Sequence, residues 1–180
     1  QYTRLLQLLL SAPPGTTCSV EYLDDVAQEG HNSVVLTQSK SALTANPVAD
    51  RANSLWKTLS NWVTLAADGG CDPDRTEFEI YVSRPVSGAL VDAFSAANTS
   101  EAALEALRLA RTTLWGKAPK YQQRNQVASG IVTYVDNVLC ADHVLAAKVI
   151  RNFKLTCSTG SPQADIEAIL RTHPISQSKI

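Results

Sequence analysis

The sequence predicts an α/β fold in which one small mixed sheet is flanked by helices and followed by a mostly helical C-terminal part. Strand-like runs rich in β-branched residues occur within 18–40 and again over 77–82. A helical apolar period separates them over 50–67, and helical spacing dominates the chain after residue 88. Helices and strands mixed in this order indicate a sheet with helices packed on its faces.

Size and composition indicate a soluble globular domain. The chain has 180 residues, of which 44% are hydrophobic and 18% charged, so one core can fold without a disulfide or metal. No apolar run reaches the roughly 20 residues that span a bilayer, and no membrane association is expected. The four cysteines form no C-x-x-C pair, which favours reduced thiols in the cytoplasm. Because Met is absent and Gln1 comes first, we expect a fragment of a longer protein.

The first forty residues predict a helix and a hairpin. Leucines recur on one side of 2–12, and the Pro-Pro-Gly run that follows ends this helix. A short strand is predicted over 18–22, and 24–29 continue it after a kink. A Gly-His-Asn turn at 30–32 leads into a second strand over 33–40, which completes the hairpin.

The rest of the chain predicts one more long strand among helices. A helix is expected over 50–67 with Trp56 and Trp62 on its apolar face, and a polar loop then leads to the strand over 77–82. Later helices are predicted over 88–96, 100–115, 122–139 and 142–151. A short strand over 153–157 precedes a last helix, for which Ser161 serves as N-cap.

Polar side chains on the hairpin form a candidate site. Side chains alternate along a strand, so Gln38 and Lys40 share one face of the second strand. Glu21 and Asp25 share a face of the first strand if that strand is continuous, and Asp24 lies next to Asp25. Pairing of the two strands can therefore bring Asp25, Gln38 and Lys40 together.

This trio suits a divalent metal and the hydrolysis of a phosphodiester. Mg²⁺ binds hard oxygen ligands, and the Asp25 carboxylate and the Gln38 amide supply such oxygens. A bound ion polarises a phosphate and acidifies an attacking water. Lys40 can hold that water or neutralise the charge that develops on the phosphate. We therefore predict a Mg²⁺ or Mn²⁺ site at the hairpin.

The arrangement of these residues resembles a known family. An Asp followed by Gln-x-Lys across a hairpin, with a helix on either side, resembles the PD-(D/E)xK nucleases and, within them, the Mrr-type branch. A more specific resemblance is to the nuclease domain of CD-NTase-associated (CBASS) anti-phage effectors, with related domains in Lamassu-type defence systems. Five stretches carry it: Gln1-Tyr2, Val20–Val26, Gln38–Lys40, Asn46–Arg51 and Leu55–Leu59.

The resemblance implies a fold and an activity. It implies a restriction-endonuclease-like core over 1–85, continued by helices of the same domain over 86–180. It further implies a metal-dependent endonuclease of double-stranded DNA that acts as the effector of a bacterial anti-phage defence system. Activation would involve a homo-oligomer or a defence complex, assembled through regions outside this chain.

The resemblance also assigns roles to residues of the hairpin. Asp25 and Gln38 would be metal ligands, and Lys40 would be the catalytic lysine. Glu21 and Asp24 would assist them, with Glu21 as a further metal ligand that compensates for the neutral Gln38. These assignments match the chemistry expected of the same side chains.

Basic side chains give candidates for DNA contact. Residues 1–90 hold 6 basic and 10 acidic side chains, whereas 91–180 hold 10 basic and 7 acidic. Phosphate contacts supply most nonspecific affinity for DNA, and the candidates for them are Lys40, Arg51, Lys57, Lys117, Lys120 and Arg124. Solvated helix faces explain the same positions equally well. No segment resembles a sequence-reading module, so low sequence specificity is expected.

Other interpretations stay open. The neutral Gln38 allows a catalytically degenerate nuclease-fold module that binds DNA or scaffolds a defence complex, and metal-dependent turnover distinguishes it from an enzyme. A helical protein–protein adaptor would bind no DNA. Pro73-Asp74 ahead of Glu77 imitates a PD motif, but the two intervening residues leave no room for a hairpin, so we interpret it as an acidic loop.

Overall fold

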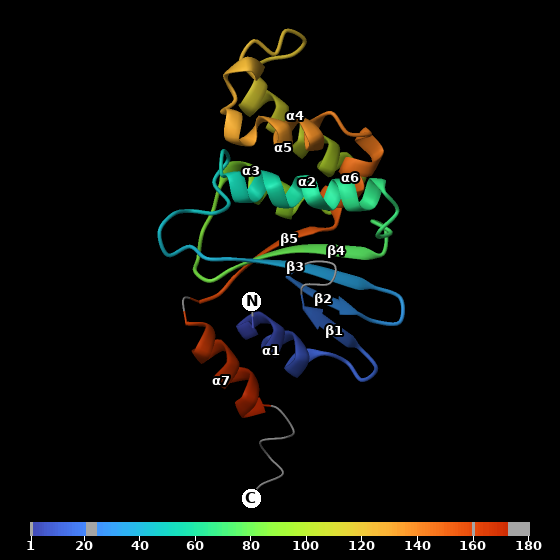
Figure 1. Cartoon of the computed structure of the whole chain (residues 1–180), viewed down its shortest axis with the longest axis vertical. Coiled ribbons are helices and arrows are strands. Elements are labelled where there is room, and N and C mark those ends of the chain that lie inside the picture. Colours follow the sequence, from blue (N-terminus) through green and yellow to red (C-terminus); the bar gives the residue numbers. More distant parts are fainter. Residues whose placement is uncertain (1, 21–24, 160, 173–180) are drawn as a thin grey trace, which may run out of the picture.

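A computed structural model describes residues 2–20, 25–159 and 161–172 of the chain (Figure 1). The described part is an α/β structure in which a five-stranded mixed sheet lies between two groups of helices. The expected class, a small mixed sheet flanked by helices, is confirmed at this level. None of the described helices is long and apolar enough to cross a membrane.

The sheet has the strand order β1-β2-β3-β4-β5. Its strands are β1 (Thr17–Val20), β2 (Val26–Glu29), β3 (Val34–Lys40), β4 (Thr76–Val82) and β5 (Phe153–Cys157). The first three strands pair antiparallel, whereas β3, β4 and β5 pair parallel. Because β3 and β4 are parallel, their carboxyl ends meet at the same edge of the sheet, with Lys40 opposite Val82.

Helices cover both faces of the sheet, as Figure 1 shows. On one face, α1 (Tyr2–Ser11) and α7 (Pro162–Thr172) pack against each other. The other face is covered by α2 (Asn53–Ala67) and by a group of further helices behind it. These are α3 (Ala89–Ala96), α4 (Ser100–Trp115), α5 (Ser129–Leu139) and α6 (His143–Arg151), with a short 3₁₀ helix at Arg124–Gln126.

The main core lies between the sheet and α2. Leu36 and Ile80 on the central strands are fully buried, as is Trp56 on α2. The Trp62 ring packs on the Phe78 ring with their centroids 5.4 Å apart. The expectation that both α2 tryptophans belong to the core is therefore confirmed.

The prediction of one continuous strand before the turn at 30–32 is wrong. β1 and β2 are separate antiparallel strands, with Val20 opposite Val26. The chain thus forms two successive hairpins that share β2, and Asp25 directly precedes this shared strand. The prediction failed because one strand that continues and two strands that reverse have the same alternation of side chains.

The helix predicted over 122–139 is also wrong in its extent. A 3₁₀ turn is followed by Val127 and Ala128 with extended ψ angles of 129° and 139°, and α5 begins only at Ser129. Val127 is buried, so its side chain fits the helical spacing of apolar residues although its backbone is not helical. The helix predicted over 50–67 begins at Asn53.

Several other boundaries were predicted well. The helix over 100–115 and the strand over 153–157 have the expected bounds. The N-cap of the last helix is confirmed, because the Ser161 Oγ accepts a hydrogen bond from the Ala164 amide at 3.3 Å.

Candidate functional site

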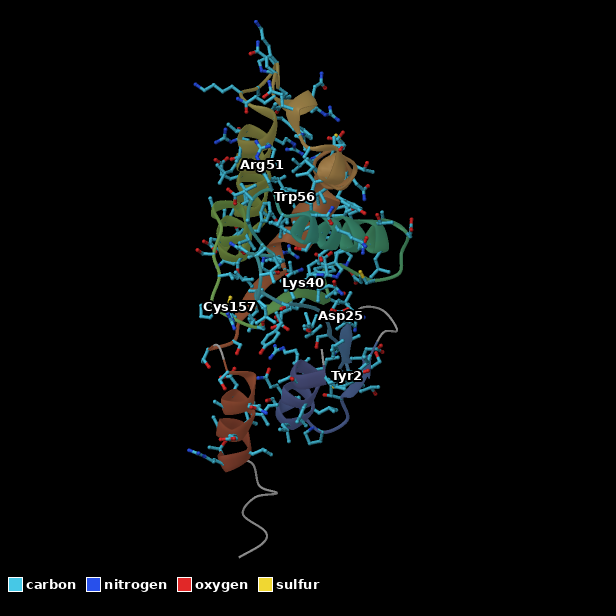
Figure 2. The ribbon with its side chains drawn as sticks, turned by 60° about the vertical axis from the view of Figure 1, so that its left-hand side comes forward. Tyr2, Asp25, Lys40, Arg51, Trp56 and Cys157 are labelled. Carbon is cyan, nitrogen blue, oxygen red and sulfur yellow. The ribbon has the colours of Figure 1, made fainter. Side chains whose placement is uncertain are left out.

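The β2–β3 hairpin brings together the three residues that the sequence singled out. A hydrogen bond of 2.9 Å from the Gly30 amide to the Ser33 carbonyl closes the turn of this hairpin. Val26 then lies opposite Thr37, so Asp25 falls opposite Gln38 at the open end. Figure 2 shows Asp25 and Lys40 near each other, between Tyr2 on α1 and Trp56 on α2.

Hydrogen bonds fix the relative positions of these side chains. The Ser39 amide donates to the Asp25 Oδ2 at 2.9 Å, which orients the carboxylate toward the end of β3. The Lys40 Nζ donates to the Gln38 Oε1 at 2.5 Å. All four residues are half-buried, so they are held by the fold and still reachable from solvent.

A cavity of about 490 Å³ opens at this edge of the sheet. Asp25, Ser39 and Lys40 line it from the hairpin, and Tyr81, Ser83 and Arg84 line it from the end of β4. The remaining lining residues are Thr3, Arg4, Ser41 and Leu43. Gln38 does not line this cavity; it lines another one together with residues of α2.

A buried ion pair fastens α1 to the sheet beside this cavity. Glu79 on β4 is 1% exposed, and its two carboxylate oxygens accept hydrogen bonds from the Arg4 Nε at 3.2 Å and Nη2 at 2.5 Å. The Thr37 hydroxyl donates to the same carboxylate at 2.8 Å. Burial favours the neutral acid, but the Arg4 charge and these hydrogen bonds outweigh it and hold the pKa of Glu79 below its ordinary value.

The donor atoms at the hairpin agree in type with a hard divalent cation. Asp25 and Gln38 offer a carboxylate and an amide oxygen, the ligand types that Mg²⁺ takes. Glu21 and Asp24 lie outside the described residues. Among the described ones, no three His, Cys, Asp or Glu side chains gather closely enough to hold a metal ion. The described donor set is therefore chemically suitable but contains a single acid.

The residues proposed for DNA contact lie in three separate places. Lys40 is in the cavity, whereas Arg51 before α2 and Lys57 on α2 are exposed. Lys117 and Lys120 are exposed in the loop that follows α4, at the far end of the helical part in Figure 1. Arg124 is used within the fold, because its guanidinium stacks 4.6 Å from the centroid of the Trp115 ring and pairs with Asp136 at 3.1 Å.

The acidic loop before β4 has a structural role. Asp74 forms ion pairs with Lys148 at 2.5 Å and with Arg151 at 2.7 Å. These contacts hold the pKa of Asp74 below its ordinary value through hydrogen bonds from both basic side chains. The interpretation of Pro73-Asp74 as a loop that leads into a strand agrees with these contacts.

Most of the cavity lining was missed by the sequence reasoning, including Arg4, Ser39, Tyr81 and Arg84. Arg84 lies two residues after a predicted strand, and the ends of parallel strands are common places for binding groups. That rule could have found it only if β3 and β4 had been predicted to be parallel neighbours. Arg4 gives no such signal, because it lies on a helix that the sequence does not place against the sheet.

Comparison of the chain with protein-family models, with curated proteins and with solved structures finds no match.

Proposed function

We propose that this chain is a metal-dependent endonuclease domain that cleaves double-stranded DNA with low sequence specificity, as the effector of a bacterial anti-phage defence system. The observation that carries the proposal is the position of Asp25, directly before β2, beside Gln38 on β3, with Lys40 two residues further along. The order of one helix, three strands, a helix and a parallel strand supports a restriction-endonuclease-like core over 1–85.

The proposed chemistry assigns one task to each side chain. Asp25 and Gln38 would hold a Mg²⁺ or Mn²⁺ ion, which when bound polarises the phosphate and lowers the pKa of the attacking water. The Ser39 amide keeps the Asp25 carboxylate in one orientation. Lys40 neutralises the negative charge that develops on the phosphate. To do this, its ammonium group gives up the hydrogen bond to the Gln38 Oε1.

One observation supports a second candidate, a catalytically degenerate module of the same fold that binds DNA or scaffolds a defence complex. The described residues place one acid, Asp25, beside the neutral Gln38. A single carboxylate binds a divalent cation more weakly than a pair does. This candidate keeps DNA binding and loses metal-dependent cleavage.

Cleavage of supercoiled plasmid DNA tests the proposal. We expect the wild-type chain at high concentration to degrade the plasmid with Mg²⁺ or Mn²⁺ and to be inactive with EDTA. Asp25→Asn and Lys40→Met should each lower the cleavage rate by about 100-fold or more, because each removes a charged group from the reacting centre.

Lys154→Met is the matched control for Lys40→Met. Lys154 is a strand lysine whose side chain is 57% exposed and whose Nζ lies 3.8 Å from a Glu77 carboxylate oxygen. It is absent from the cavity lining, so its loss should leave cleavage unchanged. Metal-dependent cleavage that persists in both hairpin variants would overturn the proposed site. DNA binding without any cleavage would favour the degenerate module.

A further inference from the structure

The segments that follow β3 and β4 are tied together at the cavity. The Ser83 amide donates to the Lys40 carbonyl at 3.1 Å, which extends the parallel pairing beyond the last residue of β4. The Ser83 hydroxyl in turn accepts from the Ala42 amide at 3.3 Å. Arg84 is the next residue, so its backbone has a fixed position relative to Lys40.

Within the described part of the chain, two buried hydroxyl groups of the cavity lining have no hydrogen-bond partner. The Ser39 Oγ and the Tyr81 hydroxyl form no hydrogen bond among the described residues, although both atoms are buried. The two residues lie opposite each other on β3 and β4. An unpaired buried donor costs free energy, so a polar ligand that accepts from these hydroxyls would bind favourably here.

The charged groups of the lining favour an anion. Among the described lining residues, three are cations (Arg4, Lys40 and Arg84) and one is an acid, Asp25. Arg4 is committed to Glu79, and its guanidinium lies 4.9 Å from the centroid of the Tyr81 ring. Arg84 is exposed, and within the described part of the chain no group is hydrogen-bonded to or ion-paired with its guanidinium.

We propose that Arg84, Tyr81 and Ser39 form a phosphate-binding subsite for the DNA backbone next to Asp25 and Lys40. An arginine fork binds two phosphate oxygens at once, and the two hydroxyls donate to oxygens of the same group. Such a contact positions the duplex without reading its sequence. The inference rests on the proposed function, since it names how that site holds its substrate.

Binding of a fluorescein-labelled 20-base-pair duplex, followed by fluorescence anisotropy with EDTA present, measures this subsite without cleavage. We expect Arg84→Gln to weaken binding by about tenfold and to lower the slope of log K against log salt by about 0.9. Tyr81→Phe should weaken binding by about fivefold and leave that slope unchanged, because it removes a hydrogen bond and no charge.

Two features distinguish ligand binding from a structural role. The Tyr81 hydroxyl has no partner in the free chain, so Tyr81→Phe should keep the wild-type midpoint of urea unfolding or raise it. Arg75→Gln is the control for Arg84→Gln, because Arg75 precedes the opposite end of the same strand and bonds to Asn32. This control should bind the duplex within about twofold of the wild-type affinity.

Each outcome decides between the two proposals. If Arg84→Gln and Tyr81→Phe bind the duplex like the wild type while Asp25→Asn abolishes cleavage, the subsite is wrong and the nuclease stands. If both variants weaken binding but the wild-type chain never cleaves with metal, the subsite stands and the nuclease is wrong. A wild-type chain that binds no duplex at low salt contradicts both.

Discussion

Glu79 is a buried carboxylate on the face of the sheet that meets α1. Its partner Arg4 is 17% exposed, so the pair is largely removed from water. Burial of two charges is costly, and their mutual attraction with good hydrogen bonds compensates for it. Loss of either partner leaves the other charge buried alone. This contact therefore helps to hold α1, which also packs on α7 and the first strands, against the sheet beside the cavity.

We expect Glu79→Gln to lower the free energy of unfolding at pH 7 by about 3 kcal/mol, since it leaves the Arg4 charge uncompensated. The pKa of Glu79 is lowered in the folded chain. Its contribution to stability is therefore complete above the ordinary glutamate pKa of about 4.3 and is lost as the pH falls through the folded-state value. The difference in the free energy of unfolding between wild type and Glu79→Gln, measured by urea unfolding, should therefore become smaller below about pH 4.3.

Glu105→Gln is the control for this measurement. Glu105 also pairs with an arginine, Arg108, but the glutamate side chain is 63% exposed. Exposed ion pairs contribute little to the free energy of unfolding, so Glu105→Gln should be as stable as the wild type both at pH 7 and below about pH 4.3. An equal loss of stability in the two variants would contradict the role assigned to the buried pair.

At the scale of elements, the segment between β3 and α2 is fixed by the segment between β4 and α3. The Asn46 Nδ2 donates to the Ser87 carbonyl at 2.7 Å, and the Asp50 Oδ1 accepts from the Leu90 amide at 2.9 Å. Gly88 lies between these contacts, and a Cβ at its position would be 2.8 Å from the Val48 carbonyl oxygen. The first of these segments begins at Ser41 and Leu43, which line the cavity.

We expect Gly88→Ala to destabilise the chain by about 1–3 kcal/mol, because the added methyl group meets a backbone oxygen that cannot rotate away. The cost is steric, since the φ angle of Gly88 is −167°, which any residue adopts. Thermal or urea unfolding measures this loss of stability.

Gly130→Ala in α5 is the matched control, because no atom lies within 4 Å of the added methyl. It should stabilise the chain by about 0.4–1 kcal/mol, and equal effects would contradict the packing argument.

The elements show which features a sequence pattern can predict. The site trio was predictable, because a short turn determines the pairing of β2 with β3 and alternation then places Gln38 and Lys40 on one face. The reversal between β1 and β2 was not, since both arrangements have the same apolar alternation. Val127 shows a similar limit for helices. Its buried side chain fits the helical spacing of apolar residues, although the backbone at Val127 is extended.

At the scale of the whole molecule, the candidate site depends on pairing between distant segments. Arg84 follows Lys40 by 44 positions and reaches the same cavity only because β3 and β4 are parallel neighbours. No local pattern around Arg84 carries that information. The phosphate-binding subsite therefore had to come from the structure, whereas the trio on a single hairpin could come from the sequence.

The basic residues are also distributed differently in space than along the chain. Arg108 and Arg124, which flank Lys117 and Lys120 along the chain, both have acidic partners. Lys117 and Lys120 remain as an exposed pair in the loop after α4. The 16 residues of α4 span about 24 Å, and Figure 1 shows this loop at the end of the molecule away from the sheet.

This separation predicts a dependence on the length of the duplex. A 10-base-pair duplex is about 34 Å long, so one centred on the cavity extends about 17 Å to either side, which is less than the length of α4 alone. We therefore expect it not to contact the lysines beyond α4. We expect the double variant Lys117→Ala and Lys120→Ala to bind it with wild-type affinity. A 40-base-pair duplex can reach both regions. The double variant should bind this longer duplex about three- to tenfold more weakly than the wild type, with a lower salt dependence.

Arg84→Gln should weaken binding at both lengths, because its contact lies in the cavity. Equal losses for the double variant at 10 and 40 base pairs would place the distal lysines inside the primary binding site and contradict this arrangement.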